Sequence, residues 1–176
     1  MEFRQTQRSE LDAVMGILAD GRDAIKKLGI DQWQGGYPHQ DIVEQDIDAG
    51  QSYVLVDDGE PLGTVALVFT GDHTYDRIED GHWLTECTSA DPDYCAIHRV
   101  AVSMRSAGRG AGRTMLREAE RIAREAGAKS LRIDTHPGNV RMRGLLASLG
   151  YTECGIIYID HAEEHTPERI AYEKLV

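Results

Sequence analysis

Residues 102–116 form a glycine-rich turn of a kind that can hold an anion. The segment reads Val102-Ser-Met-Arg-Ser-Ala-Gly-Arg-Gly-Ala-Gly-Arg-Thr-Met-Leu116, and its apolar flanks predict a strand before the turn and a helix after it. Glycines let a ligand approach the backbone, and the free N–H groups and the dipole of a helix start favour a phosphate. Arg113 stands where a P-loop needs lysine, and the glycine spacing fails the dinucleotide fingerprint. The alternative is a plain turn that binds nothing.

His98 is the side chain best suited to act as a general base. It lies in the run Ala96–Val102, an otherwise apolar stretch that gives no packing reason for the adjacent polar pair His98 and Arg99. Histidine titrates near neutral pH, as a general base should. The alternative is a buried histidine that is hydrogen-bonded to the backbone.

A second polar cluster, Asp134-Thr135-His136, follows the next predicted strand, at a sheet edge where open α/β sheets tend to bind ligands. His136 could relay a proton, and Asp134 could orient a histidine. The alternative is a helix-entry turn before Pro137, in which Asp134 or Thr135 bonds local N–H groups. A metal site built from these residues and His98 would leave the glycine turn unexplained, so we predict no metal.

Three aromatic residues stand in two irregular segments, residues 30–38 and 71–93. Trp33 and Tyr37 lie in the first segment and Trp83 in the second. Aromatic side chains on such loops can form the wall of a small-molecule pocket. The alternative is that they anchor the loops to the core.

The elements that position these residues mix strands with helices, which indicates an α/β or α+β domain over residues 1–176. A Ser9–Asp12 capping box predicts the first helix start. We expect helices over residues 11–28, 39–49, 112–126 and 139–149. We expect strands over residues 2–7, 51–56, 62–69, 94–102, 130–135, 151–160 and 170–176.

Composition narrows the class of protein. The formal net charge of −11 over 176 residues argues against nucleic acid as a partner, because phosphate binding requires a basic face. No apolar run approaches the length of about 18 residues that a membrane span needs, so we expect no membrane partner. The N-terminus has no signal-peptide pattern, and three widely spaced cysteines suit neither disulfides nor zinc. A cytoplasmic location follows as an expectation.

The glycine turn and the segments after it resemble the GNAT superfamily of N-acetyltransferases. Gly108-Arg-Gly-Ala-Gly-Arg113 looks like that family's acetyl-CoA signature, and Leu131–Asn139 and Leu145–Tyr151 are similar to its next strand, CoA-contacting asparagine and closing helix. The resemblance implies the GNAT fold, with six to seven strands and about four helices, and acetyl-CoA as cosubstrate. It places the pyrophosphate on the backbone of Gly108, Arg109, Gly110, Ala111, Gly112 and Arg113, the pantetheine arm along Ala101 and Val102, and a CoA contact at Asn139. It also implies a possible homodimer.

Two positions depart from the family pattern. Ala107 stands at the signature's Arg/Gln position, although a second alignment puts Arg105 there. Leu146 stands where many members carry a tyrosine that protonates the leaving thiolate, so no tyrosine acid acts from that position. Tyr151 and Tyr158 are weak substitutes, since each suits packing better.

The resemblance extends to the reaction. Arylalkylamine N-acetyltransferases look similar at His98, with a histidine four residues before the corresponding valine. We expect direct transfer of an acetyl group to a primary amine, because Cys95 and His98 point to opposite faces of a strand and cannot pair. The alternatives are a CoA-binding sensor without turnover and a transferase of another acyl group.

The division of charge predicts a small, cationic acceptor. Residues 99–124 carry seven arginines against Glu118 and Glu120, whereas residues 31–50 carry five acids and no Lys or Arg, and residues 71–93 carry seven acids against Arg77. A cleft rimmed by one sign of charge concentrates ligands of the other sign. The alternative is that these carboxylates lie on solvated faces.

Overall fold

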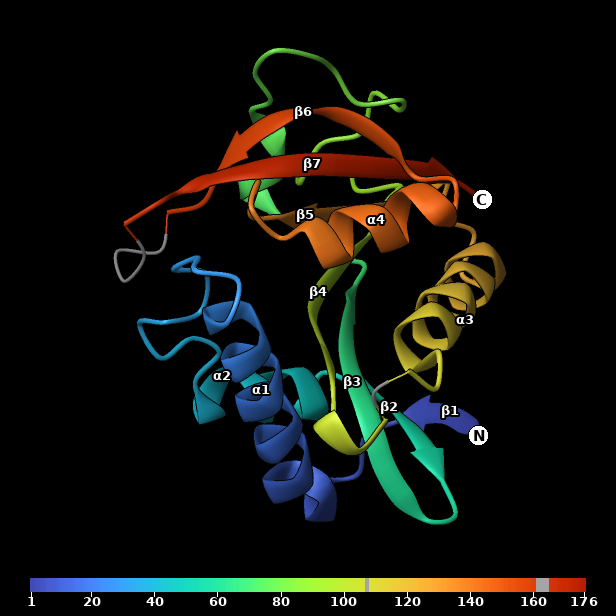
Figure 1. Cartoon of the computed structure of the whole chain (residues 1–176). Coiled ribbons are helices and arrows are strands. Elements are labelled where there is room, and N and C mark those ends of the chain that lie inside the picture. The colour runs from blue at the N-terminus through green and yellow to red at the C-terminus, as the bar shows by residue number, and fades with distance from the viewer. Residues whose placement is uncertain (107, 161–164) are drawn as a thin grey trace.

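The framework of the protein is a seven-stranded mixed sheet in the order β1-β2-β3-β4-β5-β7-β6 (Figure 1). A computed structural model describes residues 1–106, 108–160 and 165–176. Its strands are β1 (Glu2–Gln5), β2 (Ser52–Asp57), β3 (Glu60–Val68), β4 (Tyr94–Val102), β5 (Ser130–Thr135), β6 (Thr152–Tyr158) and β7 (Glu168–Leu175). Its α-helices are α1 (Leu11–Lys26), α2 (Gln40–Asp48), α3 (Ala111–Glu125) and α4 (Val140–Ser148). This arrangement confirms the predicted fold class.

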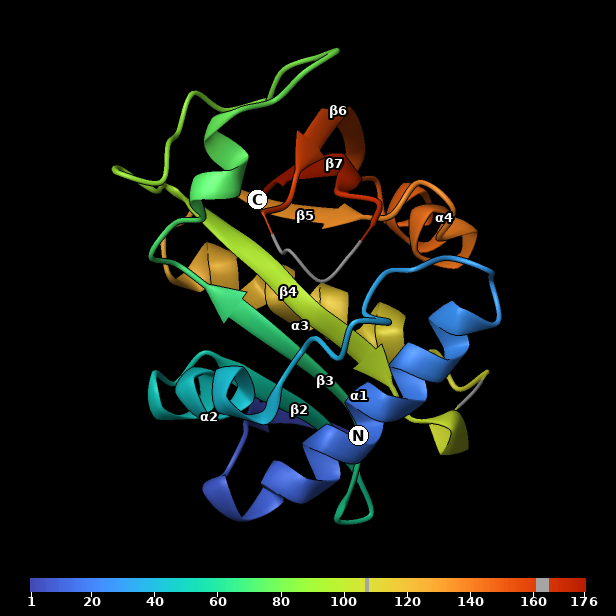
Figure 2. The same cartoon turned by 90° about the vertical axis from the view of Figure 1, so that its left-hand side faces the viewer.

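Helices cover both faces of the sheet, because alternate residues of its strands are apolar on both sides. On β2, Val54 and Val56 pack with α1, whereas Leu55 between them packs with Met115 of α3. Figure 2 shows α1 and α2 in front of β2, β3 and β4, with α3 behind them. Within the described residues, no helix combines the length and the apolar character that crossing a bilayer requires.

The start of α1 differs from the prediction. The Ser9–Asp12 capping box is absent, and a 3₁₀ turn over Arg8–Glu10 precedes the helix instead. The Glu10 carboxylate accepts a hydrogen bond from the backbone N–H of Gln7 (2.8 Å) and pairs with Arg4 (2.8 Å). Glu10 therefore closes a capping box that starts at Gln7, two residues earlier than expected.

The strands β4 and β5 separate after a short contact. Their parallel pairing joins Tyr94–Ala96 to Ser130–Arg132, and beyond Ala96 the described residues of β4 have no register partner on β5. Figure 1 shows the two strands diverging from this contact. The separation leaves an opening in the middle of the sheet, and one edge of β4 faces into it.

A β-bulge interrupts β4 beside this opening. Thr64 of β3 pairs with Ala101, and Ala66 pairs with His98, so Arg99 and Val100 together face the single residue between them on β3. Arg99 takes a left-handed backbone conformation with φ of 55°, which is costly for a residue with a side chain and needs support from its surroundings.

A buried ion pair attaches the long segment 71–93 to the sheet. Arg132 and Glu173 are both 0% exposed and lie 3.1 Å apart. The guanidinium of Arg132 lies between the rings of Trp83 and Tyr94, 4.3 and 4.2 Å from their centroids, and it donates hydrogen bonds to two backbone carbonyls of the segment. The predicted loop is therefore a fixed part of the structure, and it includes a 3₁₀ turn over His73–Asp76.

Candidate active site

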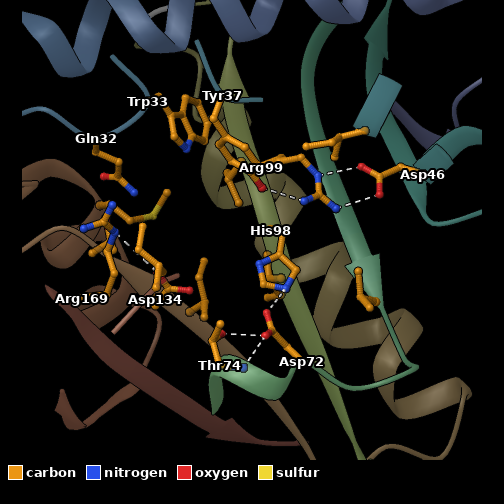
Figure 3. Close-up of a pocket in the computed structure, with 18 of the residues that line it drawn as sticks. Gln32, Trp33, Tyr37, Asp46, Asp72, Thr74, His98, Arg99, Asp134 and Arg169 are labelled. Carbon is orange, nitrogen blue, oxygen red and sulfur yellow. Dashed lines mark hydrogen bonds and ion pairs between the residues drawn. The ribbon is translucent and has the colours of Figure 1, made fainter. Parts of the chain in front are cut away.

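A cavity of about 420 Å³ lies where β4 and β5 separate. Strand β4 contributes His98 and Arg99 to its lining, β5 contributes Asp134, and the loop between α1 and α2 contributes Trp33 and Tyr37 (Figure 3). The opening in the sheet therefore gathers polar groups from segments that are distant in the sequence.

His98 contacts the carboxylate of Asp72 inside this cavity. Its Nε2 lies 3.1 Å from Oδ2 of Asp72, and the two side chains are 18% and 19% exposed. The ring of Tyr75 packs against the imidazole, with ring centroids 5.9 Å apart. Figure 3 shows one ring nitrogen on Asp72 and the other turned toward the cavity. The imidazole is thus held in one orientation by a carboxylate and an aromatic ring.

The charge of Asp72 indicates which ring nitrogen of a neutral His98 carries the proton. Burial favours a raised pKa for this carboxyl, but the contact with His98 and two hydrogen bonds from Thr74 outweigh burial and hold the pKa far below its usual range. An ionised carboxylate can only accept hydrogen bonds, so Nε2 of neutral His98 donates its proton to Asp72. The lone pair of Nδ1 is then available to accept a proton, as a general base requires.

The bulge brings Arg99 into the same cavity as His98. Neighbouring side chains on a regular strand point to opposite faces of the sheet, but the left-handed backbone at Arg99 turns both toward the opening. The Arg99 guanidinium holds both oxygens of Asp46 on α2, at 2.7 and 2.8 Å, and donates to the hydroxyl of Tyr37 at 2.9 Å. These contacts fix the bulge against α2 and the loop before it.

Asp134 lines the cavity but does not orient His98, since Asp72 occupies that position. The hydroxyl of Tyr75 donates to Oδ1 of Asp134 (2.8 Å), and Nε of Arg169 lies 4.0 Å from its other oxygen. Asp134 is therefore held in place on the opposite wall from β4.

His136 is not among the residues that line the cavity. Its Nδ1 accepts a hydrogen bond from the N–H of Gly138 (3.0 Å), and its Nε2 lies 3.5 Å from Asp31. The local N–H bond of this helix-entry turn is thus made to His136, and not to Asp134 or Thr135 as the alternative expected. The contact with Asp31 connects the end of β5 to the 30–38 loop. No group of three or more potential metal ligands occurs in the described ranges.

The predicted aromatic residues divide between the two roles considered for them. Trp33 and Tyr37 line the cavity, and Trp83 does not. The indole of Trp83 donates to the carbonyl of Tyr75 (2.8 Å) and packs on Arg132. Trp83 therefore anchors its segment to the core.

The glycine turn is open where a ligand would approach it. Gly108 and Gly110 have φ of 77° and 74°, and a Cβ at either position would meet no other atom within 4 Å. Gly110 is the N-cap of α3, which starts at Ala111, so the first N–H groups of the helix point out of the turn. Gly112 packs near Val102 and Leu145 instead. Ala107, at the signature's Arg/Gln position, lies outside the described residues.

The side chains nearest to the turn are already oriented by neighbours. Arg109 pairs with Asp57, and Arg113 donates to Ser148 (2.7 Å). Ala101 and Val102 pair with β3 on one side, have no register partner on β5, and are not among the residues that line the cavity. Asn139 caps α4 by accepting from the N–H of Met142 (3.2 Å), and it lines the cavity.

Sequence reasoning missed three residues that shape the site. Asp72 and Tyr75 come from the long segment, and Asp46 comes from α2. The one local signal was the pair Asp72 and Thr74, since an aspartate that accepts from the backbone two residues on is a common turn start. That pattern indicates a turn and carries no information about His98.

Comparisons with known proteins agree with this fold. Residues 22–151 match the model of the acetyltransferase (GNAT) family. The chain is 26% identical over 151 residues to the uncharacterised N-acetyltransferase YesJ of Bacillus subtilis (strain 168), covering 83% of this chain and 78% of that protein. A crystal structure of a GNAT-family acetyltransferase from Streptococcus agalactiae 2603 aligns with a TM-score of 0.87 at 32% identity, over 99% of this chain and 95% of that one. A putative acetyltransferase from Staphylococcus aureus MU50 shares the fold, with a TM-score of 0.70 at 21% identity and 99% of each chain covered. The family model spans well over half of the chain, and the protein therefore belongs to the GNAT family of acetyltransferases, which makes it an acyltransferase.

Proposed function

We propose that the protein transfers the acetyl group of acetyl-CoA directly to a primary amine of a small, cationic acceptor. The observation that carries this proposal is the pair of His98 and Asp72, 3.1 Å apart in the cavity between β4 and β5. The attacking amine nitrogen must shed a proton as its bond to the acetyl carbon forms, and Nδ1 of His98 is oriented to take that proton. A positioned base contributes roughly 10²–10⁴-fold to such a step.

The residues of the glycine turn fit a pyrophosphate. Backbone N–H groups at the start of α3 provide donors, and the open positions at Gly108 and Gly110 leave the backbone accessible. Arg113, which contacts the neutral hydroxyl of Ser148, adds positive charge beside the turn, whereas the charge of Arg109 is offset by Asp57. The edge of β4 at Ala101 and Val102 offers backbone groups to an extended arm that reaches from the turn into the cavity.

Direct transfer is supported by the state of Cys95. The thiol is 0% exposed, and burial raises its pKa to about 12. A thiol in this state supplies almost no thiolate at neutral pH and makes a poor acyl carrier. The acceptor amine is then the nucleophile that attacks the acetyl group.

The charges that line the cavity support a cationic acceptor. They support it more strongly than the total charge of the two acidic segments, residues 31–50 and 71–93. The lining contains four carboxylates and two arginines. The carboxylates are Asp46, Asp72, Asp134 and Asp160, and the arginines are Arg99 and Arg169. Four carboxylates of the two acidic segments pair with basic side chains elsewhere, in the pairs Glu44–Arg8, Asp48–Arg8, Glu79–Arg77 and Asp93–Lys129. The acidic excess that a ligand meets is therefore local to the cavity.

The test is release of free thiol from acetyl-CoA in the presence of a panel of amines, followed by mass spectrometry of the products. We expect acetylation of diamines or basic amino-acid derivatives, with kcat/KM falling as salt rises, because the Debye length is about 8 Å at 0.15 M ionic strength. Longer acyl-CoAs run in parallel test the acyl group. Binding of acetyl-CoA without thiol release from any amine would favour a sensor. A preferred acceptor that is neutral or anionic would refute the charge argument alone.

A further inference from the structure

The proposed transfer needs a proton donor for the thiolate that leaves. Leu146, at the position where the family resemblance led us to look for a tyrosine, is 0% exposed and packs in the core with α3. Tyr151 is buried in the same cluster, and Tyr158 is 44% exposed. Neither of these two tyrosines lines the cavity, so the donor must come from another element.

Tyr37 is the one tyrosine among the described residues that line the cavity. It reaches the cavity from the loop between α1 and α2, and its hydroxyl accepts a hydrogen bond from Arg99 (2.9 Å). In Figure 3 the side chain of Tyr37 lies above Arg99 and that of His98 below it, and both residues line the cavity. A proton acceptor and a hydroxyl donor thus border one space.

Arg99 helps the hydroxyl of Tyr37 to give up its proton. A guanidinium beside a phenol stabilises the phenolate that forms when the proton leaves. Both oxygens of Asp46 hold Arg99 in place, so no reorganisation is needed when the charge appears. Burial raises the pKa of the Tyr37 phenol above its usual value, and Arg99 opposes that rise. The phenol is therefore protonated at neutral pH and has a cation ready for its anion.

We propose that Tyr37, supported by Arg99, is the proton donor for the leaving thiolate of CoA. This assignment rests on the proposed function. The amine nitrogen forms a bond to the acetyl carbon, and its proton passes to Nδ1 of His98. The carbon–sulfur bond breaks with its electron pair on sulfur, which takes the proton of the Tyr37 hydroxyl. The proton on His98 then returns to the phenolate through solvent, so that an amide and a free thiol are the net products.

Charged groups on four elements act on Tyr37, and they set the expected pH behaviour. Arg99 of β4 lowers its pKa, and Asp46 of α2 and Asp134 of β5 raise it, while Arg22 of α1 donates to its backbone carbonyl (3.4 Å). An acid must carry its proton to act, so the rate should fall as pH rises through the pKa of Tyr37. Burial places that fall above the usual tyrosine range.

The first experiment compares Tyr37→Phe with Tyr158→Phe, using an acceptor found in the amine panel. We expect Tyr37→Phe to lower kcat by about 10²-fold, with an unchanged Kd for acetyl-CoA in calorimetry. Tyr158→Phe removes an exposed hydroxyl outside the cavity and should keep the wild-type rate. If Tyr37→Phe keeps a rate within about threefold of wild type, the assignment fails.

A second variant separates proton donation from packing. Fluorinated tyrosine incorporated at position 37 keeps the ring and the hydroxyl but lowers the phenol pKa. The alkaline limb of the pH–rate profile should then move to lower pH, which a purely structural role of Tyr37 would not cause. An unmoved limb in an active, folded variant overturns the assignment. If the wild-type chain acetylates no amine, the proposed function fails together with the assignment. If the wild type is active and Tyr37→Phe is equally active, only the assignment fails.

Discussion

Replacing Asp72 by asparagine should disable His98 through the proton position as well as through charge. Oδ1 of Asp72 accepts hydrogen bonds from the backbone N–H and the hydroxyl of Thr74, at 2.8 and 2.6 Å. In Asp72→Asn these two donors keep the amide oxygen on Thr74, so the amide NH₂ group must face Nε2 of His98. Nε2 then becomes an acceptor, and the proton of the neutral imidazole moves to Nδ1. The nitrogen that faces the cavity loses the lone pair that a base needs.

The size of the effect follows from the geometry of the pair. At the observed 3.1 Å and an effective dielectric constant of about 20, Coulomb's law gives about 5 kcal/mol between Asp72 and a protonated His98. Desolvation of two largely buried groups offsets part of this attraction. A net loss of about 3 kcal/mol corresponds to a rate loss of about 10²-fold, and the misplaced proton adds to it. We therefore expect kcat to fall by roughly 10²–10⁴-fold.

The assay is steady-state thiol release with saturating acetyl-CoA, together with calorimetry for acetyl-CoA binding. Asp93→Asn is the matched control, because it removes the same charge from an exposed pair with Lys129 and should keep the wild-type kcat. An unchanged Kd for acetyl-CoA would place the defect in the chemical step. The reasoning is refuted if Asp72→Asn, folded and able to bind acetyl-CoA, retains kcat within about threefold of wild type.

Three further predictions concern the turn, the core and the response to acid. Gly110→Asp should abolish acetyl-CoA binding in calorimetry. Gly110→Asn tolerates the same φ of 74° without a charge and should weaken binding less. Equal losses of affinity in the two variants would contradict a phosphate at the turn. Arg132→Met should lower the free energy of unfolding, measured in urea, by about 3–5 kcal/mol. The variant leaves Glu173 at 0% exposure without the arginine that pairs with it. A loss under about 1 kcal/mol would contradict a buried charge at Glu173. The lowered pKa of Asp72 stabilises the fold above the unfolded pKa of about 3.9, and that stability is lost as pH falls below it. The melting temperature of Asp72→Asn should thus fall less than that of wild type between about pH 5 and pH 3, and parallel curves by circular dichroism would exclude this contribution.

Local patterns were enough to predict the elements on which the site is built. The apolar run at residues 94–102 and the shorter run at 130–135 predicted β4 and β5 with the observed bounds, because a strand that is buried on both faces needs apolar side chains throughout. The glycines at 108 and 110 predicted the turn, since both take a left-handed conformation that favours glycine. His98 drew attention for the same reason, as a polar residue in an apolar strand.

The partner of His98 could not be predicted in this way. Asp72 lies in a segment without periodicity, and its position depends on how that segment packs against the sheet. Arg132 and Glu173 hold residues 83–87, and the hydroxyl of Tyr94 accepts from the N–H of Asp72 (2.9 Å). The sequence suggested Asp134 as the residue that orients a histidine, but in the structure its oxygens contact Tyr75 and Arg169.

Periodicity and glycine positions thus determined the strands, the helices and the glycine turn, because those features depend on residues close together in the chain. Tertiary structure decided the chemistry of the cavity. The separation of β4 from β5, the bulge at Arg99 and the packing of residues 71–93 together decide which side chains meet. Each of these features depends on contacts between residues far apart in the chain, and such contacts leave no periodic signal in a single sequence.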